Sequence, residues 1–129
     1  MTISTPISIG ELIDKITILQ IKQQRINDVD KLQHVNYELQ QLVTTLAQQQ
    51  LNSLQLRQLT DELKHINEQL WVIEDSIRAC EKAHDFSDNF IQLARRVYFT
   101  NDKRAMIKRQ INELTGSDLC EVKSYEDYA

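Results

Sequence analysis

The side chains best suited to chemistry lie in a basic segment, residues 95–109. Its six bases are Arg95, Arg96, Lys103, Arg104, Lys108 and Arg109. Asp102 is the one acid among them, whereas the whole chain carries a net charge of -4. Concentrated positive charge on an acidic protein attracts phosphate and carboxylate groups. The segment is therefore a candidate anion-binding site.

The centre of this candidate site is Thr100-Asn101-Asp102, where polar residues interrupt an apolar helical pattern. A helix that breaks at this point presents free N–H groups and a partial positive charge at its new N-terminus. Asp14 and Lys15, on an N-terminal helix that is apolar on two sides, can reach the same place. The predicted ligand-binding residues are Asp14, Lys15, Tyr98, Thr100, Asn101, Arg104 and Lys108.

A purely structural interpretation of the same residues is also open. Thr100 or Asn101 then caps a kinked helix, because both side chains can accept a hydrogen bond from a free backbone N–H. The bases are then a solvated surface, or they pair with the acids Glu74, Asp75 and Glu81 of the preceding helix. The sequence does not decide between this interpretation and an anion site.

No pattern in the chain predicts a catalytic residue, a metal site or a cofactor. Two E-x-x-H pairs occur, Glu62/His65 and Glu81/His84. Di-iron bundles use such pairs from two different helices, whereas both pairs here belong to one helix. No Ser/His/Asp or Cys/His arrangement suggests a nucleophile. The acidic remainder of the chain also disfavours contact with RNA or DNA.

The strongest architectural signal is a heptad seam in residues 54–83. Its members are Leu56, Leu59, Leu63, Ile66, Leu70, Ile73, Ile77 and Cys80. A period of 3.5 residues is typical of a long helix that packs along another helix. A second seam in residues 31–50 comprises Leu32, Val35, Leu39, Leu42 and Leu46. Only a short turn joins the two, so we expect residues 31–83 to form an antiparallel αα-hairpin.

The remaining helices are bounded by recognisable capping residues. Ser8 and Glu11 form an S-x-x-E capping box at the start of a helix over 9–27. Ser53 is suited to cap the helix over 54–83, and Gly116 to end a kinked helix over 88–114. A tail follows at 117–129. One proline and two glycines are too few for the turns of a β-rich fold. We predict a single all-α domain, 1–129: an antiparallel helical bundle with a central N-terminal helix.

Several bulk features bear on location and partners. Cys80 on the seam and Cys120 in the tail suggest reduced thiols in the cytoplasm rather than disulfides. No segment approaches the ~20 apolar residues of a membrane span. Trp71 lies off the seam, and the N-terminal helix is apolar on two sides. Either the N-terminal helix or another subunit is expected to pack at Trp71. We therefore expect a homodimer or a protein partner through the N-terminal helix and the Trp71 region.

Four segments resemble a small bacterial family of unknown function. They are SIGELIDKITIL (8–19), LWVIED (70–75), the stretch 90–116 beginning FIQLARRVYFTNDKRA, and EVKSY (121–125). The resemblance spans nearly the whole chain. It implies a short helical protein or an appended module, with a loose association with cell-surface polysaccharide genes, and no established activity.

Two functional hypotheses follow. The first is a non-enzymatic binding or scaffolding module, based on the seams and on the unexplained apolar surfaces. The alternative is an enzyme or sensor that binds a phosphorylated or nucleotide-linked sugar through residues 95–109. The alternative lacks an evident general base, and Asp14, Glu74 or Asp102 would have to serve.

Overall fold

Four α-helices account for most of the chain in the computed structural model, which describes residues 1–122 and 124–128. They are α1 (Ile9–Arg25), α2 (Val29–Gln48), α3 (Leu54–Lys82) and α4 (Asp88–Thr115). The described residues contain no β-strand. The predicted all-α bundle is confirmed, and each helix begins and ends within two residues of its expected boundary. Lys123, from the tail motif, lies outside the described residues.

The predicted capping residues are confirmed at three helix ends. The Ser8 hydroxyl accepts the Glu11 N–H at 3.0 Å, and the Ser53 hydroxyl accepts the Leu56 N–H at 3.1 Å. Gly116 follows α4 with φ 66°, a left-handed conformation that glycine adopts without a steric penalty. Each cap satisfies backbone groups that the helix leaves unpaired. The Glu11 carboxylate has a different partner, Lys108, which is described below.

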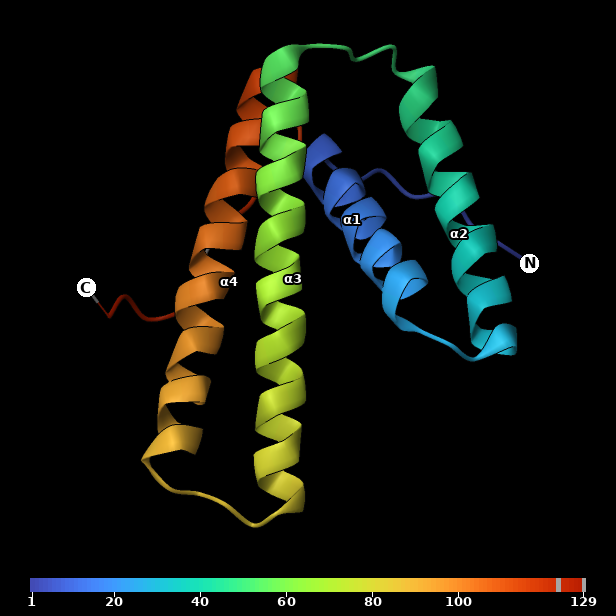
Figure 1. The fold of residues 1–129 in the computed structure, drawn as a ribbon. Helices are drawn as coiled ribbons and strands as arrows, with labels where there is room; N and C mark the ends of the chain where they lie inside the picture. Colours follow the sequence, from blue (N-terminus) through green and yellow to red (C-terminus); the bar gives the residue numbers. More distant parts are fainter. Residues whose placement is uncertain (123, 129) are drawn as a thin grey trace.

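The arrangement of the helices corrects the expected hairpin. The antiparallel pair is formed by α3 and α4, while α1 lies against α2, α3 and α4 (Figure 1). The backbones of α2 and α3, described throughout, do not come into contact, because α1 lies between them. The N-terminal helix is therefore central, as predicted. The seam of α3 packs on α4 and α1, and α2 packs on the opposite side of α1.

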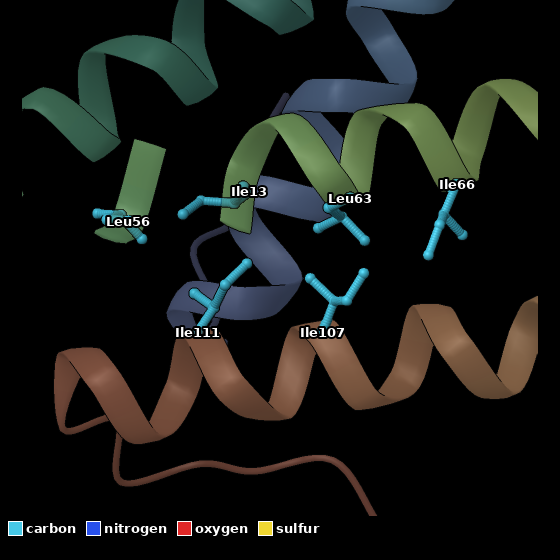
Figure 2. Close-up of a cluster of buried hydrophobic side chains, with 6 residues drawn as sticks. All are labelled: Ile13, Leu56, Leu63, Ile66, Ile107 and Ile111. Atoms are coloured by element: carbon cyan, nitrogen blue, oxygen red, sulfur yellow. The ribbon is translucent and has the colours of Figure 1, made fainter. Parts of the chain in front are cut away.

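The core lies where α1, α3 and α4 meet. Its buried side chains are Ile13, Leu56, Leu63, Ile66, Ile107 and Ile111. Figure 2 shows Leu63 and Ile66 of α3 above Ile107 and Ile111 of α4, with Ile13 of α1 at the same junction. Leu63 and Ile111 are each 0% exposed. The heptad period thus identified the buried line of α3, although its partners are different helices.

The helix break at Thr100-Asn101-Asp102, on which the candidate anion site depended, does not occur. Residues 88–115 form one continuous helix, and Thr100, Asn101 and Asp102 all lie within it. Thr100 is buried in the bundle. Tertiary packing therefore outweighs the modest helix propensity of these residues, which differs from that of alanine by less than about 1 kcal/mol per residue. No helix N-terminus exists at this point to attract an anion.

None of the described helices is long and apolar enough to cross a membrane.

Candidate functional site

A buried carboxylate, Asp14, lies at the junction of three helices. Its side chain is 1% exposed. The Arg104 guanidinium binds it in a fork, with Nε 3.0 Å from Oδ1 and Nη2 in close contact with Oδ2. Asn67 Nδ2 donates to Asp14 Oδ1 at 2.9 Å and to the Thr17 hydroxyl at 3.0 Å. One carboxylate on α1 thus joins α3 and α4 through charge-assisted hydrogen bonds.

Lys108, one turn beyond Arg104 on α4, is surrounded by acids. Its Nζ lies 2.7 Å from Glu11 Oε2, 3.1 Å from Glu121 Oε1 and 3.9 Å from Asp14 Oδ2. Burial alone lowers the pKa of Lys108, but the hydrogen bonds that its ammonium donates to Glu11 and Glu121, together with the charge of Asp14, outweigh burial and raise the pKa. The Asp14 hydrogen bond likewise raises the pKa of Arg104. Both bases are therefore charged and held in place. We call Asp14, Asn67, Arg104 and Lys108 the Asp14 network.

This network changes the interpretation of the basic segment. Arg104 and Lys108 are neither a solvated surface nor partners of α3 acids, because their ion pairs are with α1 and the C-terminal tail. Asp14 reaches the segment, as expected. Lys15 does not: its side chain is exposed and lines a different cavity, between the N-terminal residues, α1 and α2.

A cavity of about 460 Å³ opens beside the Asp14 network. It lies between α1, α3 and α4, and we call it the Trp71 cavity. Its lining residues are Ile18, Asn67, Leu70, Trp71, Glu74, Asp75, Arg78, Asn101 and Arg104. The α3 members occupy positions i, i+3, i+4, i+7, i+8 and i+11 from Asn67, which places them on one side of the helix.

The walls of the Trp71 cavity combine one large aromatic ring with polar groups of both charges. Trp71 is half-buried. Arg78 Nη2 lies 3.5 Å from Glu74 Oε2, which fixes a paired base and acid on one wall. Arg104 reaches the cavity with its guanidinium oriented from behind by Asp14. A guanidinium has five N–H donors, so the fork to Asp14 leaves others for a ligand.

The predicted ligand-binding residues separate into several places. Arg104 and Asn101 line the Trp71 cavity. Thr100 is buried, and Lys108 is enclosed by its three acids. Tyr98 packs on Phe99 and Tyr128, with ring centroids 4.9 and 5.4 Å away. The predicted set is therefore not one convergent site.

Only Asn101 and Arg104 of the cavity residues were among the predicted ligand-binding residues; Asn67, Trp71 and Arg78 are among those missed. A usable signal was present, because polar or aromatic residues at 67, 71, 74, 75 and 78 share a helical side that the seam leaves out. From the sequence, either the N-terminal helix or another subunit was expected to pack beside Trp71. In the structure Ile18 of α1 lines the same cavity as Trp71.

Within the described residues, no group of three or more His, Cys, Asp or Glu side chains is arranged to hold a metal ion.

Comparison with known proteins gives one match. No curated protein and no solved structure is significantly similar to this chain. A family model described as a family of unknown function, DUF6165, matches residues 3–128. That range includes all four helices and the described tail up to Tyr128. The chain therefore belongs to the DUF6165 family, in agreement with the resemblance seen in its helical and tail motifs.

Proposed function

We propose that this protein is a non-enzymatic binding module whose Trp71 cavity holds a neutral, hydroxyl-rich ligand, that is, a carbohydrate. The observation that carries the proposal is a half-buried indole among carboxylates, amides and guanidinium groups in a cavity of about 460 Å³. A volume of about 300–1,000 Å³ is usual for small-molecule sites.

The chemistry of the walls suits a sugar ring. One side of such a ring presents C–H groups, which pack on an aromatic surface such as that of Trp71. Its hydroxyls both donate and accept, so they need partners of both kinds. Asp75 and Glu74 accept hydrogen bonds, Arg104 and Arg78 donate them, and amide side chains do both.

The charges of the site favour a neutral ligand over a phosphate. The lining holds two acids, Glu74 and Asp75, against two bases, Arg78 and Arg104. Asp14 already pairs with Arg104, and Glu74 with Arg78. A strong anion would have to compete with both carboxylates, which a neutral polyol need not do. We therefore propose a site for uncharged hydroxyls in place of the anion site expected from residues 95–109.

A homodimer through the N-terminal helix stays a prediction, but the exposed apolar surface on which it was based is largely covered within one chain. Leu12, Ile13, Ile16, Leu19 and Ile21 of α1 are all buried within one chain. The two apolar sides of α1 are covered by α2 on one side and by α3 and α4 on the other.

The test is a thermal-shift screen against neutral mono- and disaccharides, with sulfate, inorganic phosphate and a nucleotide as anion arms. A ligand that binds only the native state raises the melting temperature by mass action. We expect a rise with at least one neutral saccharide, and none with the anions. Trp71→Ala removes the indole from the cavity and should abolish the rise.

Val72→Ala is the matched control, because Val72 is an exposed neighbour on α3 that does not line the cavity. It should respond to the saccharide as the parent does. A rise with anions alone would favour the phosphorylated-ligand alternative. No rise with any compound, or an equal loss in both variants, would contradict the proposal.

A further inference from the structure

A smaller cavity lies next to the Trp71 cavity, between α4 and the C-terminal tail. Its volume is about 220 Å³. The lining residues are Tyr98, Asn101, Asp102, Ala105, Arg109, Glu121, Val122 and Tyr125. We call it the Tyr98 cavity. It is smaller than the about 300 Å³ at which small-molecule sites usually begin, so it suits part of a ligand better than a whole one.

Asn101 lines both cavities. On a helix of 3.6 residues per turn, Arg104 is about 60° to one side of Asn101 and Ala105 about 40° to the other. Arg104 lines the Trp71 cavity, and Ala105 lines the Tyr98 cavity. The two cavities are thus neighbours that share the exposed Asn101 side chain as their boundary.

The Tyr98 cavity repeats the chemistry of its neighbour. Tyr98 and Tyr125 provide aromatic rings, Arg109 donates hydrogen bonds, and Glu121 accepts them. Asp102 is fixed by a hydrogen bond with Tyr128. Aromatic surface combined with groups of both charges is again suited to sugar rings and their hydroxyls.

The tail that forms one wall is attached at two points. Glu121 binds Lys108 at 3.1 Å, which connects the tail to the Asp14 network. Tyr128 packs on Tyr98 and Phe99, with centroid distances of 5.4 and 5.0 Å. Two attachments on either side of Val122 and Tyr125 hold this wall against α4.

We propose that the Trp71 and Tyr98 cavities are adjacent subsites for one oligosaccharide, with Asn101 at the junction between successive sugar units. This inference rests on the proposed carbohydrate function and adds the ligand's length to it. A ligand that fills both subsites binds more tightly than one that fills the first, because the second contact is intramolecular.

The experiment is a glycan array of mono- to hexasaccharides, followed by titration calorimetry with the best-bound series. We expect affinity to rise about tenfold or more from the monosaccharide to the trisaccharide, as linked subsites allow. Tyr125→Ala should remove this gain, whereas Trp71→Ala should weaken the binding of the monosaccharide itself. Tyr125 is 85% exposed, so its truncation leaves the fold intact. Tyr98→Ala should act in the same direction.

Tyr37→Ala, an exposed tyrosine of α2 outside both cavities, is the control and should retain the full gain. Affinity that depends on Trp71 but not on ligand length would overturn the two-subsite proposal and leave the proposed function standing. So would a Tyr125→Ala variant that gains affinity with length as Tyr37→Ala does. An array on which no saccharide binds would overturn both.

Discussion

The two halves of the α3–α4 pair are packed differently. In the half that α1 covers, α4 contributes Thr100, Ile107, Lys108, Ile111 and Asn112 to the buried set. In the outer half, residues 88–99 of α4 are all described and none of their side chains is buried. There α3 buries only Ile73 and Cys80 along its seam.

The difference shows what a third helix adds. Two helices bury one apolar line between them, whereas three helices enclose a volume in which polar groups must find partners. The Asp14 network is in that enclosed volume. The Trp71 cavity lies at this boundary, and its lining combines Ile18 of α1 with residues of α3 and α4. A cavity therefore opens where the third helix ceases to cover the other two.

Removing Arg104 should have the largest effect on the covered half. Arg104→Ala leaves Asp14 buried without its main counter-charge, and we expect a loss of about 3–5 kcal/mol in the free energy of unfolding. Urea denaturation measures it. Arg96→Ala, an exposed base on the same helix, should stay within about 0.5 kcal/mol of the parent.

A double variant tests the cause. Asp14→Leu with Arg104→Met replaces both charges with apolar groups, and it should be more stable than Arg104→Ala alone. If Arg104→Ala unfolds like Arg96→Ala, the ion pair does not hold the covered half together.

Truncation of apolar side chains in the covered half and in the outer half should destabilise the protein to different extents. Leu63→Ala should lower the free energy of unfolding by about 2–5 kcal/mol, because the side chain is wholly enclosed by three helices. Ile77→Ala, on the same seam but in the outer half and only half-buried, should cost about 1 kcal/mol. Equal losses in chemical denaturation would mean that the two halves are equally well packed.

A side chain is unfavourable at each of the two glycines for a different reason: close neighbouring atoms at Gly10 and backbone conformation at Gly116. A Cβ at Gly10 would lie 2.6 Å from the Lys108 carbonyl oxygen and 2.8 Å from Asn112 Oδ1. Gly10→Ala should therefore force α1 away from α4 and cost about 1–3 kcal/mol. A Cβ at Gly116 would meet no described atom within 4 Å apart from its own chain neighbours, and only the φ of 66° opposes a side chain there. Gly116→Ala should cost about 1 kcal/mol.

The two glycine variants should also differ in where they act. Hydrogen exchange should show α1 opening in Gly10→Ala and only the end of α4 opening in Gly116→Ala. The same exchange pattern in both would count against the tight α1–α4 contact.

The smallest expected effect concerns the tail. A hydrogen bond to the Asp102 carboxylate raises the pKa of Tyr128 from 10.0 to about 12. The folded state thus favours the neutral phenol. Its contribution to tail attachment is complete below pH 10 and is lost as the pH rises toward about 12.

Phenolate absorbance during alkaline titration measures this step. Tyr128→Phe should remove the late ionisation, and Asp102→Ala should shift it to lower pH. A late step that persists in Asp102→Ala would mean that Asp102 is not its cause.

Much of the secondary structure was predictable because its causes are local. Helices begin at Ser8 and Ser53 and one ends at Gly116, through hydrogen bonds or φ values that involve only neighbouring residues. The break considered at Thr100-Asn101-Asp102 does not occur, for the opposite reason. Those residues have local preferences for capping, and burial of Thr100 against the bundle outweighs them.

The candidate site was predictable only in part. Arg104 and Asn101 were identified from charge and polarity, and Asp14 from its place on a helix that is apolar on two sides. The structural role of Lys108 could not be predicted, because its charge is paired with Glu11 and Glu121. These residues are about a hundred positions and about a dozen positions away in the sequence. Trp71 was recognised as lying off the heptad seam, but heptad spacing does not predict that a cavity lies beside it.

By itself the sequence determined an all-α chain, the extent of its helices and the line of residues that α3 buries. These follow from periodicity and capping, which act within a few residues. Only the tertiary structure decided that α1 lies between α2 and α3, and that Asp14 neutralises Arg104. Heptad seams are alike in shape and apolar character, so a seam cannot specify which helix it meets. That choice depends on how all four helices together enclose apolar surface and pair their buried charges.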